Sequence, residues 1–373
     1  MGSSSGQRWA PGCRHVPNSA TRGPAGSDLA AAAKEEEARA HDPTTIDEDG
    51  GMRIDAVDPR DLDLDTADEL AELRRSCLVG VDVAAYTGPA LLLDIVEGSG
   101  EPEDQVVLLA REDDRLVGWA RATEPRREYT DSLFLQGCVA PDHQGRGVGR
   151  ALLDALTAGT TRTRLRTRAW EGTPGRPALT AWGFTASHTS AVRRLDLDAP
   201  DPGWSSMRRE ADAAADGYEL VRRVGPTPEA DLQEMVVLRE AINDAPDALE
   251  FESYPTDRIA AYEQALTRRR QTQYTVVARH RGTGEPAGLS MVCVDEFDPS
   301  TAHQEDTSVV RAHRGHRLGL LLKLDMIAWL RHERPEVTGV ETWNDSTNHH
   351  MIAVNERLGM REVARSTVFK RER

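Results

Sequence analysis

The chain has 373 residues, of which 39% are hydrophobic and 29% are charged, and its formal net charge is -16. This length suits two domains of about 150 residues each better than one small domain. The acidic balance argues against a nucleic-acid-binding protein or a protein that attaches to an anionic membrane, and it weakly favours a cationic substrate such as an amine. The sequence shows neither an apolar run long enough to span a membrane nor a secretion signal, so we expect a cytoplasmic protein.

Residues 1–51 differ in composition from the rest of the chain. Gly, Ser, Pro and Arg dominate the start, and an Ala/Glu run at 30–40 predicts at most a lone, marginal helix. A different texture begins at Met52. We therefore predict a disordered tail over 1–51, with the folded protein beginning at residue 52.

The next unit, residues 52–198, alternates helix and strand patterns. A helix is expected at 70–78, and strands at 106–111 and 116–122 are joined by an acidic hairpin turn. Further strands are expected at 133–135, 163–170 and 191–197, with a helix that ends at Gly183. The arginines at 162, 164, 166 and 168 alternate along one strand face, which is either solvated or in contact with an acidic surface of the second unit.

A glycine-rich turn lies between the strand at 133–135 and the helix that follows it. Glycine lets the backbone approach a bulky anion, and the free N–H groups and dipole of a helix N-terminus attract phosphate. The same pattern also fits a tight turn that binds nothing. It lacks the Lys-Ser/Thr pair of a Walker loop and the order of a Rossmann fingerprint. The candidate anion-binding residues are Val139, Gln144, Gly145, Arg146, Gly147, Val148, Gly149 and Arg150.

After a Pro/Gly/Asp-rich linker at 199–217, residues 218–373 repeat this order of elements. Helices are expected at 231–242, 256–269 and 320–331, strands at 274–279, 288–294, 307–310 and 339–343, and a last helix ends at Gly359. A second loop stands where the first unit has its glycine-rich turn. Its candidate residues are Val309, Arg314, Gly315, His316, Arg317, Leu318 and Gly319.

The spacing Gln144-x-x-Gly147-x-Gly149 after Val139 resembles the acyl-CoA signature Q/R-x-x-G-x-G/A of the GCN5-related N-acetyltransferases (GNAT family). With its repeat, the chain resembles a tandem GNAT protein. The resemblance implies two α/β domains, each with a mixed, mostly antiparallel sheet flanked by helices. It also implies that the loop amides hold the CoA pyrophosphate, while the preceding strand offers backbone groups to the pantetheine and the thioester.

Each half departs from the family pattern at a different place. The first half keeps the loop but lacks the later N-x-x-A-x-x-x-Y signature. The second half keeps Asn348, a position that typically touches CoA in the family. However, Asn355 stands at its Tyr position and Arg317 replaces the middle loop glycine. We therefore expect the first half to be the better CoA binder, and the acid that protonates the leaving thiolate is not identified.

The resemblance implies transfer of an acyl group, most often acetyl, from acetyl-CoA or another acyl-CoA to the primary amine of a small metabolite. A backbone N–H near Val139 or Val309 would stabilise the oxyanion, and a carboxylate or His would take the amine proton. The candidate catalytic bases are Asp131, Glu171, His303 and Asp306, although each also fits an ordinary solvated strand end or loop. Two alternatives stay open: a non-catalytic acyl-CoA-binding or scaffold protein, and an acyltransferase that acts on a peptide or protein amine.

The four cysteines, Cys13, Cys77, Cys138 and Cys293, are scattered without a C-x-x-C pair. This spacing predicts neither a metal site nor a disulfide framework.

Overall fold

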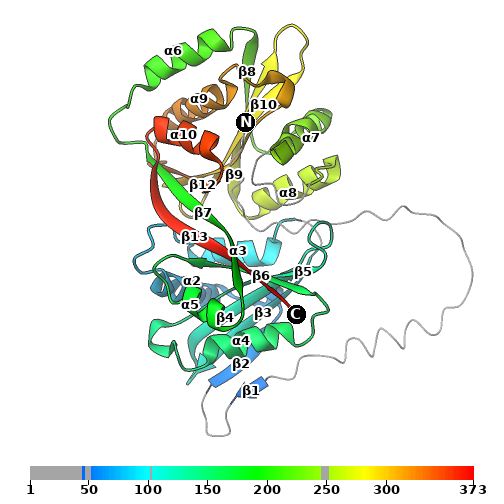
Figure 1. Cartoon of the computed structure of the whole chain (residues 1–373), viewed down its shortest axis with the longest axis vertical. Helices are drawn as coiled ribbons and strands as arrows, with labels where there is room; N and C mark the ends of the chain where they lie inside the picture. The colour runs from blue at the N-terminus through cyan, green and yellow to red at the C-terminus, as the bar shows by residue number, and fades with distance from the viewer. Residues whose placement is uncertain (1–43, 47–51, 101–102, 245–251) are drawn as a thin grey trace, which may run out of the picture.

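A computed structural model describes residues 44–46, 52–100, 103–244 and 252–373 (Figure 1). The marginal helix expected at 30–40 lies outside the described residues. Within the predicted tail, the short strand β1 (Thr44–Ile46) pairs antiparallel with β2 (Met52–Val57).

The first half follows the predicted order and adds a helix, α3, that the sequence pattern did not reveal. Its elements after β2 are α2 (Leu64–Cys77), α3 (Gly88–Glu97), β3 (Asp104–Glu112), β4 (Arg115–Glu124), β5 (Ser132–Val139), α4 (Val148–Thr157), β6 (Arg164–Trp170), α5 (Gly175–Ala181) and β7 (Thr185–Asp196). Asp113 and Asp114 adopt positive φ angles of 48° and 65° at the predicted hairpin turn, as the two central residues of a type I′ turn do.

The second half repeats this order after one additional helix. Its elements are α6 (Trp204–Ala214), β8 (Tyr218–Val224), α7 (Leu232–Glu240), α8 (Thr256–Arg268), β9 (Gln271–His280), β10 (Pro286–Asp295), β11 (Thr301–Val309), α9 (Leu318–Glu333), β12 (Gly339–Asp345), α10 (His349–Arg357) and β13 (Arg361–Glu372). Helix α6 occupies the segment predicted as a linker. It buries Trp204, Met207 and Ala211 at helical spacing against the core of the second half.

The described strands form one thirteen-stranded sheet, in the order β1-β2-β3-β4-β5-β6-β13-β7-β12-β11-β10-β9-β8. The two halves exchange their last strands, because β6 of the first half pairs with β13 while β7 pairs with β12 of the second half. Figure 1 shows β7 and β13 crossing side by side at the junction between the halves. The exchange joins the halves through the middle of the sheet, so neither half has a complete sheet of its own.

Helices cover both faces of this sheet. Leu152 of α4 and Leu179 of α5 pack in one core cluster with β6, and α9 packs with β7 and β12 on the same face. The opposite face carries α2, α3, α7 and α8. We call it the α3/α8 face, because these helices from the two halves meet there: Arg269, the residue that caps the C-terminus of α8, lies 3.2 Å from Asp94 of α3. This arrangement confirms the predicted α/β fold with a mostly antiparallel sheet between helices.

Candidate functional site

The first loop presents open backbone at the start of α4. Gly145 and Gly147 have φ angles of 78° and 92°, and a Cβ added to either would meet no heavy atom within 4 Å. Among the described residues, the N–H groups of Gly145, Arg146 and Gly147 have no protein acceptor. Gln144 ties the start of the loop to the end of β5, because its exposed side chain donates through Nε2 to the carbonyl of Val139 at 3.0 Å. This geometry fits an anion held by backbone N–H groups.

Strands β5 and β6 diverge before they reach this loop. They pair in parallel at only three positions, the last being Phe134 with Arg166, although β5 continues to Val139. We call the Phe134–Arg166 pair the first fork. Beyond this pair, the edge of β5 that faces β6 forms no further ladder, while its other edge stays paired with β4. Thr167 Oγ1 of β6 donates to the Leu135 carbonyl of β5 across the gap at 2.9 Å. The fork therefore leaves peptide groups of β5 available next to the loop.

The second loop has nearly the same backbone but different surroundings. Gly315 and Arg317 have φ angles of 90° and 54°, and Arg314 donates to the Val309 carbonyl at 3.1 Å as Gln144 does to Val139. Arg317 thus adopts the left-handed conformation of the glycine it replaces. Its guanidinium, however, binds Glu210 of α6 at 2.8 Å. Together with a 3.3 Å contact from His316 to the Ala214 carbonyl, this places α6 against the second loop.

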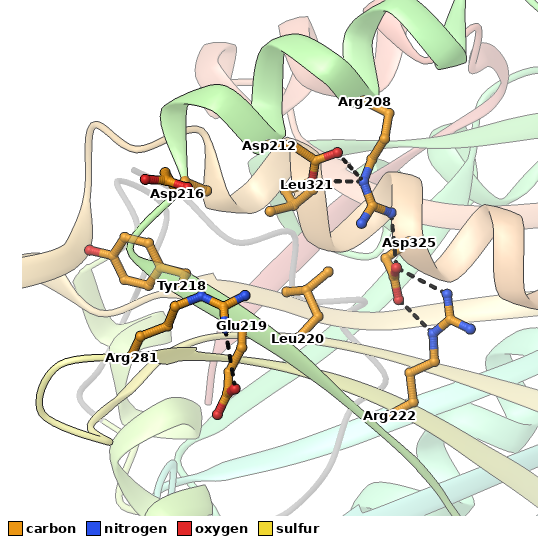
Figure 2. A pocket seen from close by; sticks show the side chains of 11 residues that line it. Arg208, Asp212, Asp216, Tyr218, Glu219, Leu220, Arg222, Arg281, Leu321 and Asp325 are labelled. Carbon is orange, nitrogen blue, oxygen red and sulfur yellow. Dashed lines mark hydrogen bonds and ion pairs between the residues drawn. The ribbon is translucent and has the colours of Figure 1, made fainter.

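A cavity of about 580 Å³ lies between α6, β8 and α9, beside this second loop (Figure 2). Its charged side chains bind one another: Arg208 and Arg222 both reach the buried Asp325, at 2.9 and 2.7 Å. Figure 2 shows this three-residue bridge together with Arg281 near Glu219. The charges that line the cavity are therefore largely compensated within the protein.

The predicted bases of the first half lie at opposite ends of β6. Asp131 forms an ion pair at 2.9 Å with Arg164, the first residue of β6. Glu171 directly follows the last residue of β6 and forms an ion pair with Arg176 at 3.3 Å. Both side chains are substantially exposed. The structure does not bring them together, and each has the surroundings of an exposed ion pair.

The predicted bases of the second half lie on β11, where His303 precedes a β-bulge and Asp306 is part of it. His303 pairs with Glu341 of β12 at the last parallel position, which we call the second fork. Glu305 and Asp306 form the bulge, because both stand opposite Met291 of β10. The Asp306 carboxylate forms an ion pair with the Arg239 guanidinium of α7 at 2.8 Å. Burial raises the pKa of Asp306 above its usual range, while the Arg239 guanidinium opposes that shift.

The second fork is filled by protein groups. Glu341 is 5% exposed and accepts the Arg194 side chain at 2.9 Å and the backbone N–H of Ala84 at 3.2 Å. Ala84 belongs to the first half, in the segment between α2 and α3. A segment of the first half therefore contacts the second fork, at the place where an acyl-CoA bound to the second half would need space between β11 and β12.

The asparagines of the second half form contacts within the protein. Asn348 is the N-cap of α10 and accepts the Met351 N–H at 3.3 Å. Asn355, at the family's Tyr position, donates to Asn344 Oδ1 at 2.8 Å, and both side chains are fully buried. The amide of Asn355 offers no acidic O–H group at this position.

Two thiols lie beside the first loop. Cys77 of α2 donates to the Val139 carbonyl at 3.2 Å. Its contact with Cys138 lowers the pKa of Cys77, while that contact and burial raise the pKa of Cys138 well above the usual value. Cys77, Cys138 and Cys293 are free thiols.

Side chains that we had not assigned to a site occupy the centre of the α3/α8 face. Arg166 and Arg168 of β6 are not edge residues, because β13 covers that side of the strand. Arg168 stacks on Trp343 of β12 at 4.5 Å, and burial lowers the pKa of Arg168 to about 10. The alternating arginines were the only signal of this cluster in the sequence. The strand exchange that brings Trp343 to them left no local pattern.

Within the part of the chain that the structure describes, no helix is long and apolar enough to cross a membrane. The same residues contain no group of three or more His, Cys, Asp or Glu side chains placed to hold a metal ion.

Comparison with known structures gives relatives for both halves together. The chain resembles a tandem GNAT protein from the clavulanic acid biosynthesis pathway, solved without AcCoA, at 27% identity and a TM-score of 0.70 over 86% of this chain and 98% of that one. A GCN5-related N-acetyltransferase from Sphaerobacter thermophilus shares the fold at 17% identity and a TM-score of 0.58, over 88% and 97% of the chains. A GNAT-family acetyltransferase from Colwellia psychrerythraea shares it at 14% and 0.51, over 85% and 98%. No curated protein matches the sequence.

Family models locate the two domains directly. A model of the acetyltransferase (GNAT) domain matches residues 103–182, and a model of the acetyltransferase (GNAT) family matches residues 238–360. Together they span more than half of the chain, and each includes one of the two loops. The chain therefore belongs to the GNAT family as a protein with two GNAT domains in tandem, and it is an enzyme of the acyltransferase class.

Proposed function

We propose that the chain transfers an acetyl group from acetyl-CoA to the primary amine of a small molecule, and that the first of its two domains, 52–198 and 218–373, holds the cofactor for transfer. The observation that carries this proposal is the open loop beside the first fork. Gly145 and Gly147 leave the backbone N–H groups uncovered, whereas α6 lies against the second loop. The first loop is thus the better cradle for a pyrophosphate.

The roles of the other candidate residues follow from this placement. The N–H groups of residues 145–150 and the dipole of α4 would bind the pyrophosphate. The pantetheine arm would lie along β5, which runs about 16 Å from Val139 back to Phe134, so the thioester would reach the first fork. A backbone N–H of β5 would stabilise the oxyanion, and Asp131 or Glu171 would accept the amine proton, directly or through water.

The second half remains the alternative site of transfer. His303, Asp306, Asn348 and the loop at 314–319 are its candidate residues. The buried pair of Asp306 with Arg239 beside the bulge favours this alternative, because such pairs cluster at functional sites.

The test is a calorimetric titration of acetyl-CoA into the full chain and two matched variants, Gly147→Trp and Arg317→Trp. Gly147 and Arg317 stand at equivalent points of the two loops, so the same bulky side chain is introduced at each; at Gly147, whose φ angle is 92°, it also strains the backbone, which adds to the loss expected there. We expect Gly147→Trp to abolish binding and Arg317→Trp to retain it, with CoA release from acetyl-CoA and amines following the same order. The reverse result would move the transfer site to the second half, and no binding by the unmodified chain would refute the proposal.

A further inference from the structure

Arg166 lies at the first fork, on the face opposite α4. Leu165 and Ala169 of β6 pack into the core beneath α4, so strand alternation turns Arg166 and Arg168 towards the α3/α8 face. Helices α4 and α5 cover the other face. A molecule that approaches the first fork from outside would therefore meet Arg166 on the α3/α8 face.

Arg166 is a buried cation whose direct contacts, within the part of the chain that the structure describes, are neutral; the nearest carboxylate in this network is Asp131, which accepts from the Ser132 hydroxyl at 2.7 Å. It is 8% exposed, its Nε donates to the Ser132 hydroxyl at 3.0 Å, and its guanidinium stacks on Tyr129 at 4.9 Å. Among the described residues no carboxylate forms an ion pair with it. The neighbouring Arg164, on the same strand face, binds both Asp131 and Glu372. Buried charges are normally paired, so a guanidinium left with neutral partners in a chain of net charge -16 indicates a partner that arrives from solution.

A second arginine and two tryptophan rings lie on the same side of the sheet as Arg166. Arg168 lies two residues along the same face and stacks on Trp343, whose ring is 5.2 Å from that of Trp170. His188 of β7 also belongs to this cluster, because the charges of Arg166 and Arg168 act with burial to lower the pKa of His188, while Asp345 opposes them. The wall therefore combines strands from both halves, β6 and β7 with β12.

The second fork provides an internal comparison. Glu341 holds the position that corresponds to Arg166, since each is the β6 or β12 member of the last parallel pair. Glu341 is paired with Arg194 inside the protein. The opposite charge and the complete pairing at the second fork show that the fold itself does not require an uncompensated arginine at this position.

We propose that the amine acceptor of the first half carries a carboxylate, which the Arg166 guanidinium binds at the first fork. This inference rests on the proposed function and names its substrate class: amino acids and related amino carboxylates rather than simple amines. A guanidinium binds a carboxylate through parallel N–H bonds, which fixes the orientation of the acceptor as well as its charge. Arg168 and the Trp170–Trp343 pair would then surround the remainder of the acceptor.

The bound acceptor would place its amine beside the thioester. The amine nitrogen forms a bond to the acyl carbon while the carbon–sulfur bond breaks, giving an amide and CoA. The amine loses one proton to the base, and the departing thiolate gains one to leave as free thiol, so atoms and charge balance without a further reactant. Arg166 takes no part in proton transfer and acts by binding and orienting the acceptor.

The experiment measures CoA release by the full chain with acetyl-CoA and paired acceptors: each common L-amino acid, its amide, and the amine that lacks the carboxylate. We expect the carboxylate members to react with at least a tenfold higher kcat/KM. Arg166→Gln should remove that preference mainly through KM, and Arg166→Lys should restore part of it. Arg164→Gln is the matched control, because Arg164 shares the strand face but has carboxylate partners, and it should keep the preference.

Each result decides between the proposals. Equal or faster reaction of the amines and amides would overturn the inference, and so would an unchanged preference in Arg166→Gln. Binding of acetyl-CoA without reaction of any carboxylate member would also overturn it while leaving the cofactor site intact. Failure to bind acetyl-CoA would instead refute the proposed function.

Discussion

Ser190 of β7 and Ser366 of β13 are direct partners in the antiparallel ladder between the exchanged strands. They are also equivalent residues, because each lies seven positions after the glycine, Gly183 or Gly359, that ends its half's last helical turn. A residue that pairs with its own equivalent marks a local two-fold axis. The axis passes through the exchanged strands, so the two halves are related like the subunits of a dimer that has swapped a strand.

This relationship predicts that the first half does not form a stable monomer by itself. Residues 52–198 alone would lose β13, which lies between β6 and β7, and would leave the facing edges of both strands unpaired. Unpaired central edges favour association with another chain. We expect this fragment to elute as a dimer or aggregate in size-exclusion chromatography and to unfold without the cooperative transition of 52–373.

Addition of residues 360–373 as a separate peptide provides the control for the fragment. If the exchanged strand is what is missing, the peptide should restore a monomeric complex with cooperative unfolding. A fragment that is monomeric and unfolds cooperatively without the peptide would show that β7 can take the place of β13 beside β6.

Much of this architecture could be predicted from residues close together in the sequence. The loop at 144–149, its repeat at 314–319 and most helices and strands follow from glycine spacing and apolar periodicity. The strand exchange could not be predicted, because β7 and β13 have similar patterns and either one would bury similar residues beside β6. Helix α6 was missed because Pro and Gly at 200–203 resemble a linker. Its apolar positions become informative only against α9.

Candidate site residues divide along the same line. The turn at each loop was predictable from local sequence, because Gly145, Gly147 and Gly315 all adopt the positive φ angles that glycine favours. The carboxylates were harder to assign, since Asp131 and Glu171 have ordinary exposed partners. Arg166 could be identified as a candidate only in the structure, because its contacts with Ser132 and Tyr129 join segments that are more than 30 residues apart in the sequence.

Gln144 supports the loop, and its loss should weaken cofactor binding. Its side chain fixes the Val139 carbonyl at 3.0 Å and so holds the end of β5 against the loop. Removal of one such hydrogen bond costs about 1 kcal/mol, which corresponds to an approximately five-fold weaker Kd. We expect Gln144→Ala to bind acetyl-CoA several-fold more weakly in calorimetry, with a loss of at most about 1 kcal/mol in the free energy of unfolding.

Arg314→Ala is the matched change in the second loop, because Arg314 makes the same contact to Val309. It should leave acetyl-CoA affinity unchanged if the first loop holds the cofactor. Loss of affinity in Arg314→Ala, with none in Gln144→Ala, would contradict the assignment.

Lys323 of α9 should make stability depend on pH. Its side chain is 1% exposed, its ammonium nitrogen contacts Gln304 Oε1 at 3.3 Å, and burial lowers its pKa to about 7 from 10.5. Between these values the unfolded chain binds the proton more strongly than the folded chain, so this residue's contribution makes stability rise with pH from about 7 to 10.5. Urea unfolding at pH 7, 8 and 9 should show the wild type gaining about 1 kcal/mol per pH unit relative to Lys323→Met. Exposed Lys370, changed to Met, should run parallel to the wild type, and a parallel profile for Lys323→Met would show that Lys323 keeps its proton in the folded protein.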